Sequence, residues 1–434
     1  MKAAFYTLGC KVNQYDTEAM AELFQGAGYE LVPFSEPADV YIVNTCSVTQ
    51  MSDKKSRQMV SRAHTLAPEA LIVVTGCYAQ RAPEEVAALP GVKVVSGTKD
   101  HGRILQLVEE QLASGDPVNA VGDLKTGTAF ETVKAAREGR TRAYLKIQDG
   151  CNRYCTYCII PYTRGPIRSR SLESIREEYE QLAAEGFCEV VLTGIHLMSY
   201  GLDMKPRSSV FDAIRAADDV EGIKRIRLGS LEPQALSDEN IAYLASNPKI
   251  CRQFHLSLQS GSTEVLRRMN RRYTAEEYAD CVDRLRAAMP DCAITTDIIA
   301  GFPGETEEQF QETLRFAEMV KLSRIHAFPY SRRTGTPAAT YPDQVPQQVK
   351  NRRNKELIAL SDRLAAEYRA QFVGTVQSVL FEEMIDGMPE GCTGTYLRVR
   401  AAGEESLLGK IADVRIESIE GDKLLGSLIC PECS

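Results

Sequence analysis

The chain has 434 residues, enough for two or three domains of roughly 150 residues each. Apolar residues make up 44% of it, charged residues 25%, and no stretch approaches the ~20 apolar residues of a membrane span. The first residues lack the charged and apolar regions of a signal peptide, so we expect a cytoplasmic protein without a membrane association. Thirteen cysteines in that compartment argue against a disulfide framework and indicate metal or redox chemistry.

Residues 1–115 alternate short apolar runs with helical patterns. Strands are predicted at AAFYTLGC, ADVYIVNTC and ALIVVTGC, with helices from Thr17 to Ala27, from about Asp53 and after Pro83. Continuous apolar strands that alternate with helices predict a parallel sheet covered on both faces. Residues 116–136 lose this pattern, are rich in small and turn-forming residues, and are predicted to be a linker.

Residues 137–370 begin a second alternating region. Six strands are predicted, at AYLKIQ, EVVLTG, KRIRLGS, QFHLSLQ, AITTDIIAG and SRIHAF. Six strand–helix repeats predict a partial (β/α)6 barrel, short of the eight repeats of a closed one. A polar helix from about Gln347 to Gln371 leads to residues 371–434, whose short β patterns predict a small β-barrel. The fold class is therefore α/β, with an N-terminal parallel sheet, a central partial barrel and a C-terminal β-barrel.

Three cysteines lie within eight residues, in Cys151-Asn-Arg-Tyr-Cys155-Thr-Tyr-Cys158, directly after the first predicted barrel strand. Active sites of such barrels lie at the C-terminal ends of the strands. Three thiolates on a cubane iron–sulfur cluster leave the fourth iron open to a substrate or cofactor, whereas electron-transfer clusters usually have four cysteines. The alternatives are a structural zinc site or reduced surface thiols.

This motif resembles the C-x3-C-x2-C signature of the radical S-adenosylmethionine superfamily, in which an aromatic residue, here Tyr157, precedes the last cysteine. The resemblance implies a [4Fe–4S] cluster held by Cys151, Cys155 and Cys158. Its open iron would bind S-adenosylmethionine, and one electron would cleave the sulfonium to give a 5′-deoxyadenosyl radical. The protein would orient and shield these cofactors.

Cys10, Cys46 and Cys77 are far apart in the sequence, but each ends an apolar strand, in TLGC, VNTC and VTGC. The C-terminal ends of strands in an open parallel sheet form a ligand crevice, so these cysteines could face one another. From the residues alone, a metal site and ordinary buried cysteines both remain possible.

Across the whole chain, TLGCKVNQYDTE, NTCSVT and TGCYAQR resemble the N-terminal domain of the methylthiotransferases, which precedes a radical domain and a C-terminal TRAM barrel. The resemblance implies that Cys10, Cys46 and Cys77 hold a second [4Fe–4S] cluster with an open iron, which takes part in sulfur delivery. It also implies tRNA as a partner, a flavodoxin- or ferredoxin-like electron donor and a sulfur donor.

Smaller predictions concern residues near strand ends. Thr193 and Gly194 are candidates for the methionine amino group, Glu232, Ser257 and Gln259 for the ribose, and Asp297 and Gly301 for the region near the adenine. The alternative for each is a turn or a cap. His196, His255 and His326 are more readily explained by packing or structural hydrogen bonds. Cys430 and Cys433 form either a redox or metal-handling tail or an ordinary chain end.

Basic residues gather in three places despite the net charge of −8. Residues 137–170 carry a net +6, residues 321–355 a net +7, and Arg267, Arg268, Arg271 and Arg272 have helical spacing and could share one face. Such patches could neutralise phosphates of tRNA, or they could be solvated surface. Residues 371–434 carry a net −6, so the TRAM barrel is not expected to bind RNA by bulk charge.

Two segments indicate the substrate. Gly9-Cys10-Lys11-Val12-Asn13 and Thr193-Gly194-Ile195-His196-Leu197 resemble the branch that acts on N6-threonylcarbamoyladenosine at tRNA position 37 and gives its 2-methylthio derivative. The branch acting on isopentenyladenosine typically has Gln-Met-Asn after the first cysteine. Arg332 and Arg333 are candidates to pair with the threonylcarbamoyl carboxylate. The alternatives are isopentenyladenosine, a ribosomal protein side chain, or a non-enzymatic iron–sulfur protein that binds RNA.

Overall fold

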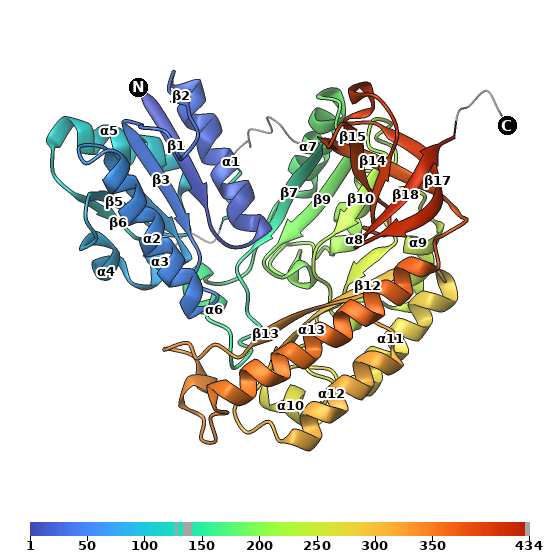
Figure 1. Cartoon of the computed structure of the whole chain (residues 1–434). Coiled ribbons are helices and arrows are strands. Elements are labelled where there is room, and N and C mark those ends of the chain that lie inside the picture. Colours follow the sequence, from blue (N-terminus) through green and yellow to red (C-terminus); the bar gives the residue numbers. More distant parts are fainter. Residues whose placement is uncertain (126–128, 133–140, 430–434) are drawn as a thin grey trace.

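The computed structural model describes residues 1–125, 129–132 and 141–429. Figure 1 shows three parts: the N-terminal sheet, the central barrel and the C-terminal barrel. Among the described helices, none combines the length and apolar character that a bilayer crossing requires. Arg137, Arg140, Cys430 and Cys433 lie outside the described residues.

The N-terminal sheet is parallel throughout, in the order β2-β1-β3-β4-β5-β6. Its strands are β1 (Lys2–Thr7), β2 (Glu30–Leu31), β3 (Val40–Thr45), β4 (Leu71–Gly76), β5 (Val92–Ser96) and β6 (Val118–Ala120). Its α-helices are α1 (Lys11–Gly26), α2 (Gln50–Leu66), α3 (Cys77–Arg81), α4 (Pro83–Ala87) and α5 (Ile104–Ser114). Alternate residues of β3 and β4 enter two separate hydrophobic cores, one on each face, which confirms the predicted two-sided sheet.

Two of these bounds differ from the prediction. Helix α1 begins at Lys11 rather than near Thr17, because Val12, Tyr15 and Ala19 continue its buried face toward the N-terminus. Strand β6 pairs with β5, so the sheet extends into the segment predicted to be a linker.

The central barrel contains all six predicted strands, which confirms this fold class. They are β7 (Arg142–Asp149), β9 (Glu189–Gly194), β10 (Arg225–Leu228), β11 (Gln253–His255), β12 (Ala293–Ala300) and β13 (Arg324–Pro329); a two-residue β8 (Arg168–Ser169) runs antiparallel to β7. The order is β8-β7-β9-β10, then β11-β12-β13, and the bridge between Ile226 and Ile250 joins the two sheets. Strands β7 and β13 are not paired, so the barrel is open between them.

Helices cover the outside of this barrel (Figure 1). They are α7 (Leu172–Ala184), α8 (Val210–Arg215), α9 (Asp238–Ser246), α10 (Thr263–Arg268), α11 (Ala275–Ala288), α12 (Glu307–Met319) and α13 (Gln347–Ala370). The last of them, α13, packs on β13 and leads to the C-terminal domain. The short helix α6 (Ile160–Arg164) instead lies against α3 of the N-terminal domain.

The C-terminal domain is a closed barrel in the order β14-β15-β16-β18-β17. Its strands are β14 (Val376–Ile385), β15 (Met388–Thr393), β16 (Arg398–Ala401), β17 (Ile411–Glu420) and β18 (Lys423–Leu428). Arg225 and Arg227 of β10 donate hydrogen bonds to backbone carbonyls of Ser378, Cys392, Thr393 and Gly394. The small barrel therefore caps the central barrel at the end where the strands begin.

Candidate active site between two cysteine trios

The N-terminal cysteines lie at one edge of the sheet. Cys10 precedes α1, Cys46 follows β3, and Cys77 begins α3 directly after β4. Strands β1, β3 and β4 are neighbours, so their carboxyl ends meet at this edge. Gly9 has φ of +106°, and a Cβ atom there would lie 2.9 Å from the Sγ of Cys46. The loop before Cys10 thus lies directly against Cys46, and only glycine allows this approach.

These thiols also interact electrostatically with each other. Burial, together with the neighbouring thiols of Cys46 and Cys10, raises the pKa of Cys77 to about 11, although the charge of Arg164 opposes this shift. Burial also raises the pKa of Cys46. A cysteine must lose its thiol proton before it can bind a metal. Arg164 is the nearby cation that favours this thiolate form.

The second trio lies in the loop between β7 and α6. Burial raises the pKa of Cys151 to about 11 and that of Cys158 to about 12, and the other thiols of the trio add to both shifts. The backbone N–H of Arg153 donates to the Sγ of Cys151 at 3.4 Å. This loop follows the C-terminal end of a barrel strand, where the sequence predicted it.

A single metal ion and an iron–sulfur cluster require different spacings of three thiols. Among the described residues, no three His, Cys, Asp or Glu side chains converge on a point where they could bind one metal ion. Thiolates on a single zinc ion, with Zn–S distances of about 2.3 Å, lie within roughly 4 Å of one another. A four-iron cubane is a larger body that holds its cysteines farther apart.

Arg271 is the cation beside the second trio. Its side chain is only 7% exposed, and it donates to the Sγ of Cys155 at 3.4 Å and to Glu232 at 2.8 Å. Glu232 also pairs with Arg153. Burial alone would raise the pKa of Glu232, but the hydrogen bond from His196 and the charge of Arg271 outweigh it and lower the pKa to about 2. The carboxylate stays ionised and fixes two arginines around the cysteine loop.

Arg164 has the corresponding place beside the first trio, although it belongs to the central barrel. Its side chain is fully buried and donates to both carboxylate oxygens of Asp149, at 3.0 and 2.9 Å, and to Asp16 of α1 at 3.1 Å. Lys146 pairs with the same two aspartates, at 2.8 and 2.6 Å. Asp149 is two residues before Cys151, so one buried ion network links the two trios. The charges along the sequence do not reveal this network, because Asp16 belongs to a different domain from Lys146 and Arg164.

The other predicted site residues gather at the same end of the barrel. Thr193 and Gly194 end β9, Gly301 follows β12, and the backbone N–H of Gln259 donates to the carbonyl of Asp297 at 2.8 Å. Ser257 lies in the same segment, and its carbonyl accepts from Arg271. Tyr157 lies between two cysteines of the loop, and burial raises its pKa well above the usual value. None of these placements identifies a cofactor contact, and the roles of these residues stay predictions.

The structure corrects the arginine patch at 267–272. Helix α10 ends at Arg268, and Asn270 has φ of +60°, so the four arginines do not share a helical face. Arg271 turns inward to Cys155, and Arg268 donates to the carbonyl of Pro303 and to Gln309. Arg267, 77% exposed, and Arg272 remain at the surface.

The described part of the stretch 137–170 is largely internal, whereas in 321–355 only Arg333 and Arg353 are buried and most of the other basic residues are exposed. Lys146, Arg164, Arg168, Arg170, Arg333 and Arg353 are all buried. Arg333 donates to Asp53 at 2.9 Å and to Ser47 at 2.8 Å, in the loop and helix that follow Cys46, so it is not free to bind a substrate carboxylate. Arg332 is exposed and donates to the carbonyl of Ala339. Asp149 pairs with Lys146 and Arg164 within the same stretch, but Asp16, Asp53 and Glu305, which pair with Arg164, Arg333 and Arg353, come from distant parts of the sequence.

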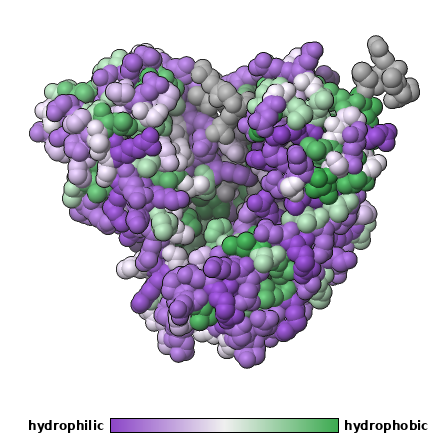
Figure 2. Space-filling view, in the orientation of Figure 1, coloured by the Kyte–Doolittle hydropathy of each residue, from purple (hydrophilic) through white to green (hydrophobic). Residues whose placement is uncertain are grey.

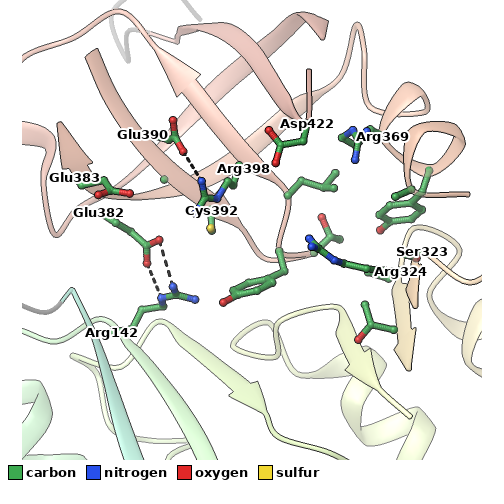
Figure 3. A pocket seen from close by; sticks show the side chains of 18 residues that line it. Arg142, Ser323, Arg324, Arg369, Glu382, Glu383, Glu390, Cys392, Arg398 and Asp422 are labelled. Carbon is green, nitrogen blue, oxygen red and sulfur yellow. Dashed lines mark hydrogen bonds and ion pairs between the residues drawn. The ribbon is translucent and has the colours of Figure 1, made fainter. Parts of the chain in front are cut away.

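A polar cavity of about 440 Å³ lies between the C-terminal barrel and the central barrel (Figure 3). Its wall includes the starts of β7, β12 and β13, the end of the barrel opposite to the cysteine loop. Arg142 points to Glu382 and Arg398 to Glu390, so much of its charge is already paired. The site predicted from the cysteines is instead at the carboxyl ends of the strands, and Figure 2 shows the surface hollowed between the N-terminal domain and the rest of the molecule.

Lys11 is a further residue near the first trio; in the sequence it stands out only as part of the segment Gly9–Asn13. It follows Cys10, and its side chain is exposed although burial, together with Arg227 and Arg142, lowers its pKa to about 8. Its position next to a candidate cluster ligand would have been the signal to find it.

Comparisons with known proteins match this arrangement. Residues 145–317 match the model of the radical SAM superfamily, and residues 2–97 match the uncharacterized protein family UPF0004. The chain is 47% identical to the threonylcarbamoyladenosine tRNA methylthiotransferase MtaB of Bacillus subtilis, over 95% of this chain and 93% of that protein. It is 36% identical to the tRNA-2-methylthio-N(6)-dimethylallyladenosine synthase of Natranaerobius thermophilus, over 98% and 96% of the two chains.

Among solved structures, the fold is similar to that of the radical S-adenosylmethionine methyltransferase TsrM from Kitasatospora setae. The TM-score is 0.57 at 17% identity, over 78% of this chain and 77% of that one. At this identity the likeness concerns the fold alone.

Proposed function

Because the chain belongs to the radical S-adenosylmethionine methylthiotransferases, we propose that it converts N6-threonylcarbamoyladenosine at position 37 of tRNA to its 2-methylthio derivative. The observation that carries the proposed reaction is the pairing of two cysteine trios, one from each domain, across one buried ion network. The choice of nucleoside is supported by the 47% identity to a threonylcarbamoyladenosine enzyme against 36% to a dimethylallyladenosine enzyme of similar coverage.

The family uses S-adenosylmethionine and [4Fe–4S] clusters. In our proposal Cys151, Cys155 and Cys158 hold the cluster that binds S-adenosylmethionine, and Cys10, Cys46 and Cys77 hold the second one. When bound, these groups supply one-electron cleavage of S-adenosylmethionine, the sulfur atom and the methyl group. With three cysteines to each cluster, one iron in each remains open.

The residues of the chain hold and orient these groups. Arg271 and Arg164 each place a guanidinium beside one thiol trio, where it favours the thiolate form. Glu232 and Asp149 fix those guanidinium groups. Thr193, Gly194, Ser257, Gln259, Asp297 and Gly301 remain the candidates for contacts to S-adenosylmethionine. The hollow between the domains would admit the adenosine to both clusters at once.

Two further partners are part of the proposal. Cleavage of S-adenosylmethionine needs one electron, so a flavodoxin- or ferredoxin-like donor must reach the cluster. Each turnover also consumes a sulfur atom, so a sulfur donor must restore it. Both reactions need reduced thiols, and we propose that the protein acts in the cytoplasm.

The test is a comparison of substrates with anaerobically reconstituted protein. Anticodon-arm RNAs carrying threonylcarbamoyladenosine, isopentenyladenosine or unmodified adenosine are incubated with S-adenosylmethionine and a reductant, and the nucleosides are identified by mass spectrometry. We expect the methylthio product from the threonylcarbamoyl RNA. A product from isopentenyladenosine alone would refute the assigned nucleoside, and cleavage of S-adenosylmethionine without any RNA product would refute the tRNA reaction. Cys151→Ala serves as the inactive control.

A further inference from the structure

Three polar side chains lie close together inside the central barrel: His255 of β11, Asp297 of β12 and His326 of β13. Each is adjacent in the sequence to a residue of the hydrophobic core that the strands share with the outer helices, namely Phe254, Ile298 and Ile325. Side chains alternate between the two faces of a strand, so the three polar ones face the barrel interior. Asp297 and His326 are paired across β12 and β13, and Nε2 of His255 lies 3.4 Å from Oδ2 of Asp297.

A chain of hydrogen bonds fixes the acceptor that Asp297 presents. Gln253 donates to Oγ1 of Thr295 at 3.0 Å, and this oxygen lies 3.1 Å from Nδ1 of His255. Because the Thr295 oxygen accepts from Gln253, its own proton is directed to Nδ1, and His255 carries its proton on Nε2. That proton faces one oxygen of Asp297. The other carboxylate oxygen accepts no hydrogen bond from the residues that the structure describes, so it is available to a ligand.

His326 provides the complementary donor. Its side chain is exposed, forms no hydrogen bond or ion pair within the described ranges, and carries at least one N–H in either protonation state. Neighbouring strands are about 5 Å apart, so Asp297 and His326 place an acceptor next to a donor. Adenine has the matching edge, because its N6–H donates a hydrogen bond and the adjacent N7 accepts one.

This pair lies in the barrel below the cysteine loop. The carbonyl of Ser257, two residues after His255, accepts from Arg271, which also donates to Cys155. Two residues of a strand span about 7 Å, so His255 and Asp297 are a short step further into the barrel than the arginine beside the thiols. An adenine held by N6–H and N7 leaves C2, on the opposite side of the base, free for the reaction.

The same interior face continues into the cavity between the two barrels. Thr295 and Arg324, two residues before Asp297 and His326, both line this cavity of about 440 Å³ (Figure 3). Its volume is in the range of small-molecule sites, roughly 300–1,000 Å³. Among the described residues, none forms a hydrogen bond or ion pair with the Arg324 guanidinium, which is therefore available to a phosphate. The cavity thus has room and charge for the sugar and phosphate of a nucleotide whose base contacts Asp297.

We propose that Asp297 and His326 bind the adenine of the substrate tRNA, at its N6–H and N7 respectively. This rests on the proposed function and assigns Asp297 to the substrate instead of S-adenosylmethionine. Strand β13 borders the opening of the barrel, and His326 is exposed there. An exposed position suits a base that enters and leaves in each turnover, whereas a cofactor that forms a radical is enclosed.

The proposed contact also limits the conformation of the substrate. After threonylcarbamoyl addition N6 keeps one hydrogen, so N6–H reaches Asp297 only when the N6 substituent points away from N7. An isopentenyl group leaves the same single hydrogen. The contact therefore positions the base for reaction at C2 and does not select between the two substituents.

The test changes one atom of the substrate. Anticodon-arm RNAs carrying N6-threonylcarbamoyladenosine or its 7-deaza analogue, in which a C–H group replaces N7, are compared. For the wild type we expect kcat/KM and RNA affinity to be roughly tenfold lower with the 7-deaza RNA. His326→Phe keeps an aromatic ring without the N–H; it should lose a similar factor on the normal RNA and nothing more on the 7-deaza RNA. His326→Gln, which keeps an N–H donor, should retain most of the difference.

Asp297→Asn tests the acceptor. The new amide oxygen accepts from His255, so the amide NH2 group is left facing N6–H. We expect kcat/KM and affinity to fall roughly 10- to 100-fold with both RNAs, the range of a hydrogen bond to a charged group. The Kd of S-adenosylmethionine and the iron content should stay at the wild-type level. Asp362→Asn, which removes an exposed carboxylate of α13, is the matched control and should behave as wild type.

Three outcomes would overturn the inference. Equal use of the two RNAs by the wild type would show that N7 is not bound, and this result does not depend on any variant folding. A full loss on the 7-deaza RNA in His326→Phe would assign N7 to another donor. Weaker binding of S-adenosylmethionine by Asp297→Asn, with unchanged RNA affinity, would return Asp297 to the cofactor. If the wild type cleaves S-adenosylmethionine but forms no product from the threonylcarbamoyl RNA, the proposed function itself fails.

Discussion

Arg164 of the central barrel donates to Asp16 of the N-terminal domain at 3.1 Å, inside the network that joins the two cysteine trios. The same side chain lowers the pKa of Cys77, although burial raises it overall. One residue thus connects the domains and supplies positive charge to the candidate N-terminal cluster.

Removal of this charge should lower the midpoint potential of the N-terminal cluster, because the guanidinium stabilises the more negative, reduced state. We expect Arg164→Gln to lower the equilibrium constant for reduction of this cluster about tenfold. For a one-electron couple this lowers the midpoint potential by about 59 mV. Arg164→Lys should stay near wild type. The measurement is a redox titration followed by electron paramagnetic resonance, in a background without Cys151, Cys155 and Cys158. An unchanged potential in Arg164→Gln would restrict Arg164 to a structural role.

The two trios should hold iron independently. Two cubane clusters give about eight irons per chain after anaerobic reconstitution. Replacing Cys151, Cys155 and Cys158 with alanine should remove about half of the iron and abolish cleavage of S-adenosylmethionine. Full iron content in that variant would show that these cysteines are not the ligands.

The reciprocal variant, with alanine at Cys10, Cys46 and Cys77, should also lose half of the iron. It should still cleave S-adenosylmethionine but form no methylthio product. Cys281→Ser and Cys292→Ala provide a control for the loss of thiols elsewhere. Both cysteines are buried in the barrel core.

Of the four arginines at 267–272, only the exposed ones should act on tRNA. Replacing Arg267 and Arg272 with alanine should weaken binding and lower the slope of log K against log salt by about 1.5, since roughly two fewer counterions are released. Arg271→Ala should instead impair the cluster beside Cys155 and leave the salt slope unchanged. Binding isotherms at several salt concentrations distinguish these effects. An unchanged slope in the double variant would mean that both side chains are ordinary solvated surface.

Glu232 should contribute to stability at neutral pH and lose this contribution in acid. Its pKa is lowered from 4.5 to about 2, so the carboxylate binds protons less readily in the folded state than in the unfolded state. Its stabilising effect is therefore complete above about pH 4.5 and declines as the pH falls toward 2. The free energy of unfolding of the reduced apoprotein, measured with denaturant at several pH values, should show this decline. In Glu232→Gln the free energy of unfolding should fall less steeply over the same pH range. Parallel pH curves for the two proteins would contradict the assignment.

The sequence predicted the fold class well, because hydrophobic periodicity is a local property. Each strand of the N-terminal sheet that ends in a cysteine, and each of the six barrel strands, was visible as an apolar run. The order of these runs was enough to predict a two-sided parallel sheet, an open barrel and a small β-barrel. The loop with Cys151 could be placed at the carboxyl end of a strand for the same reason.

Charge was predicted poorly, because the partners of an ion pair need not be near each other in the sequence. Arg164 pairs with Asp16, Arg333 with Asp53 and Arg271 with Glu232, and none of these pairs is local. What the sequence alone determined is which segments are buried and which cysteines end strands. Only the tertiary structure decided which cations are internal and which, like Lys11, stay accessible, because burial of a charge depends on the partner that the fold brings to it.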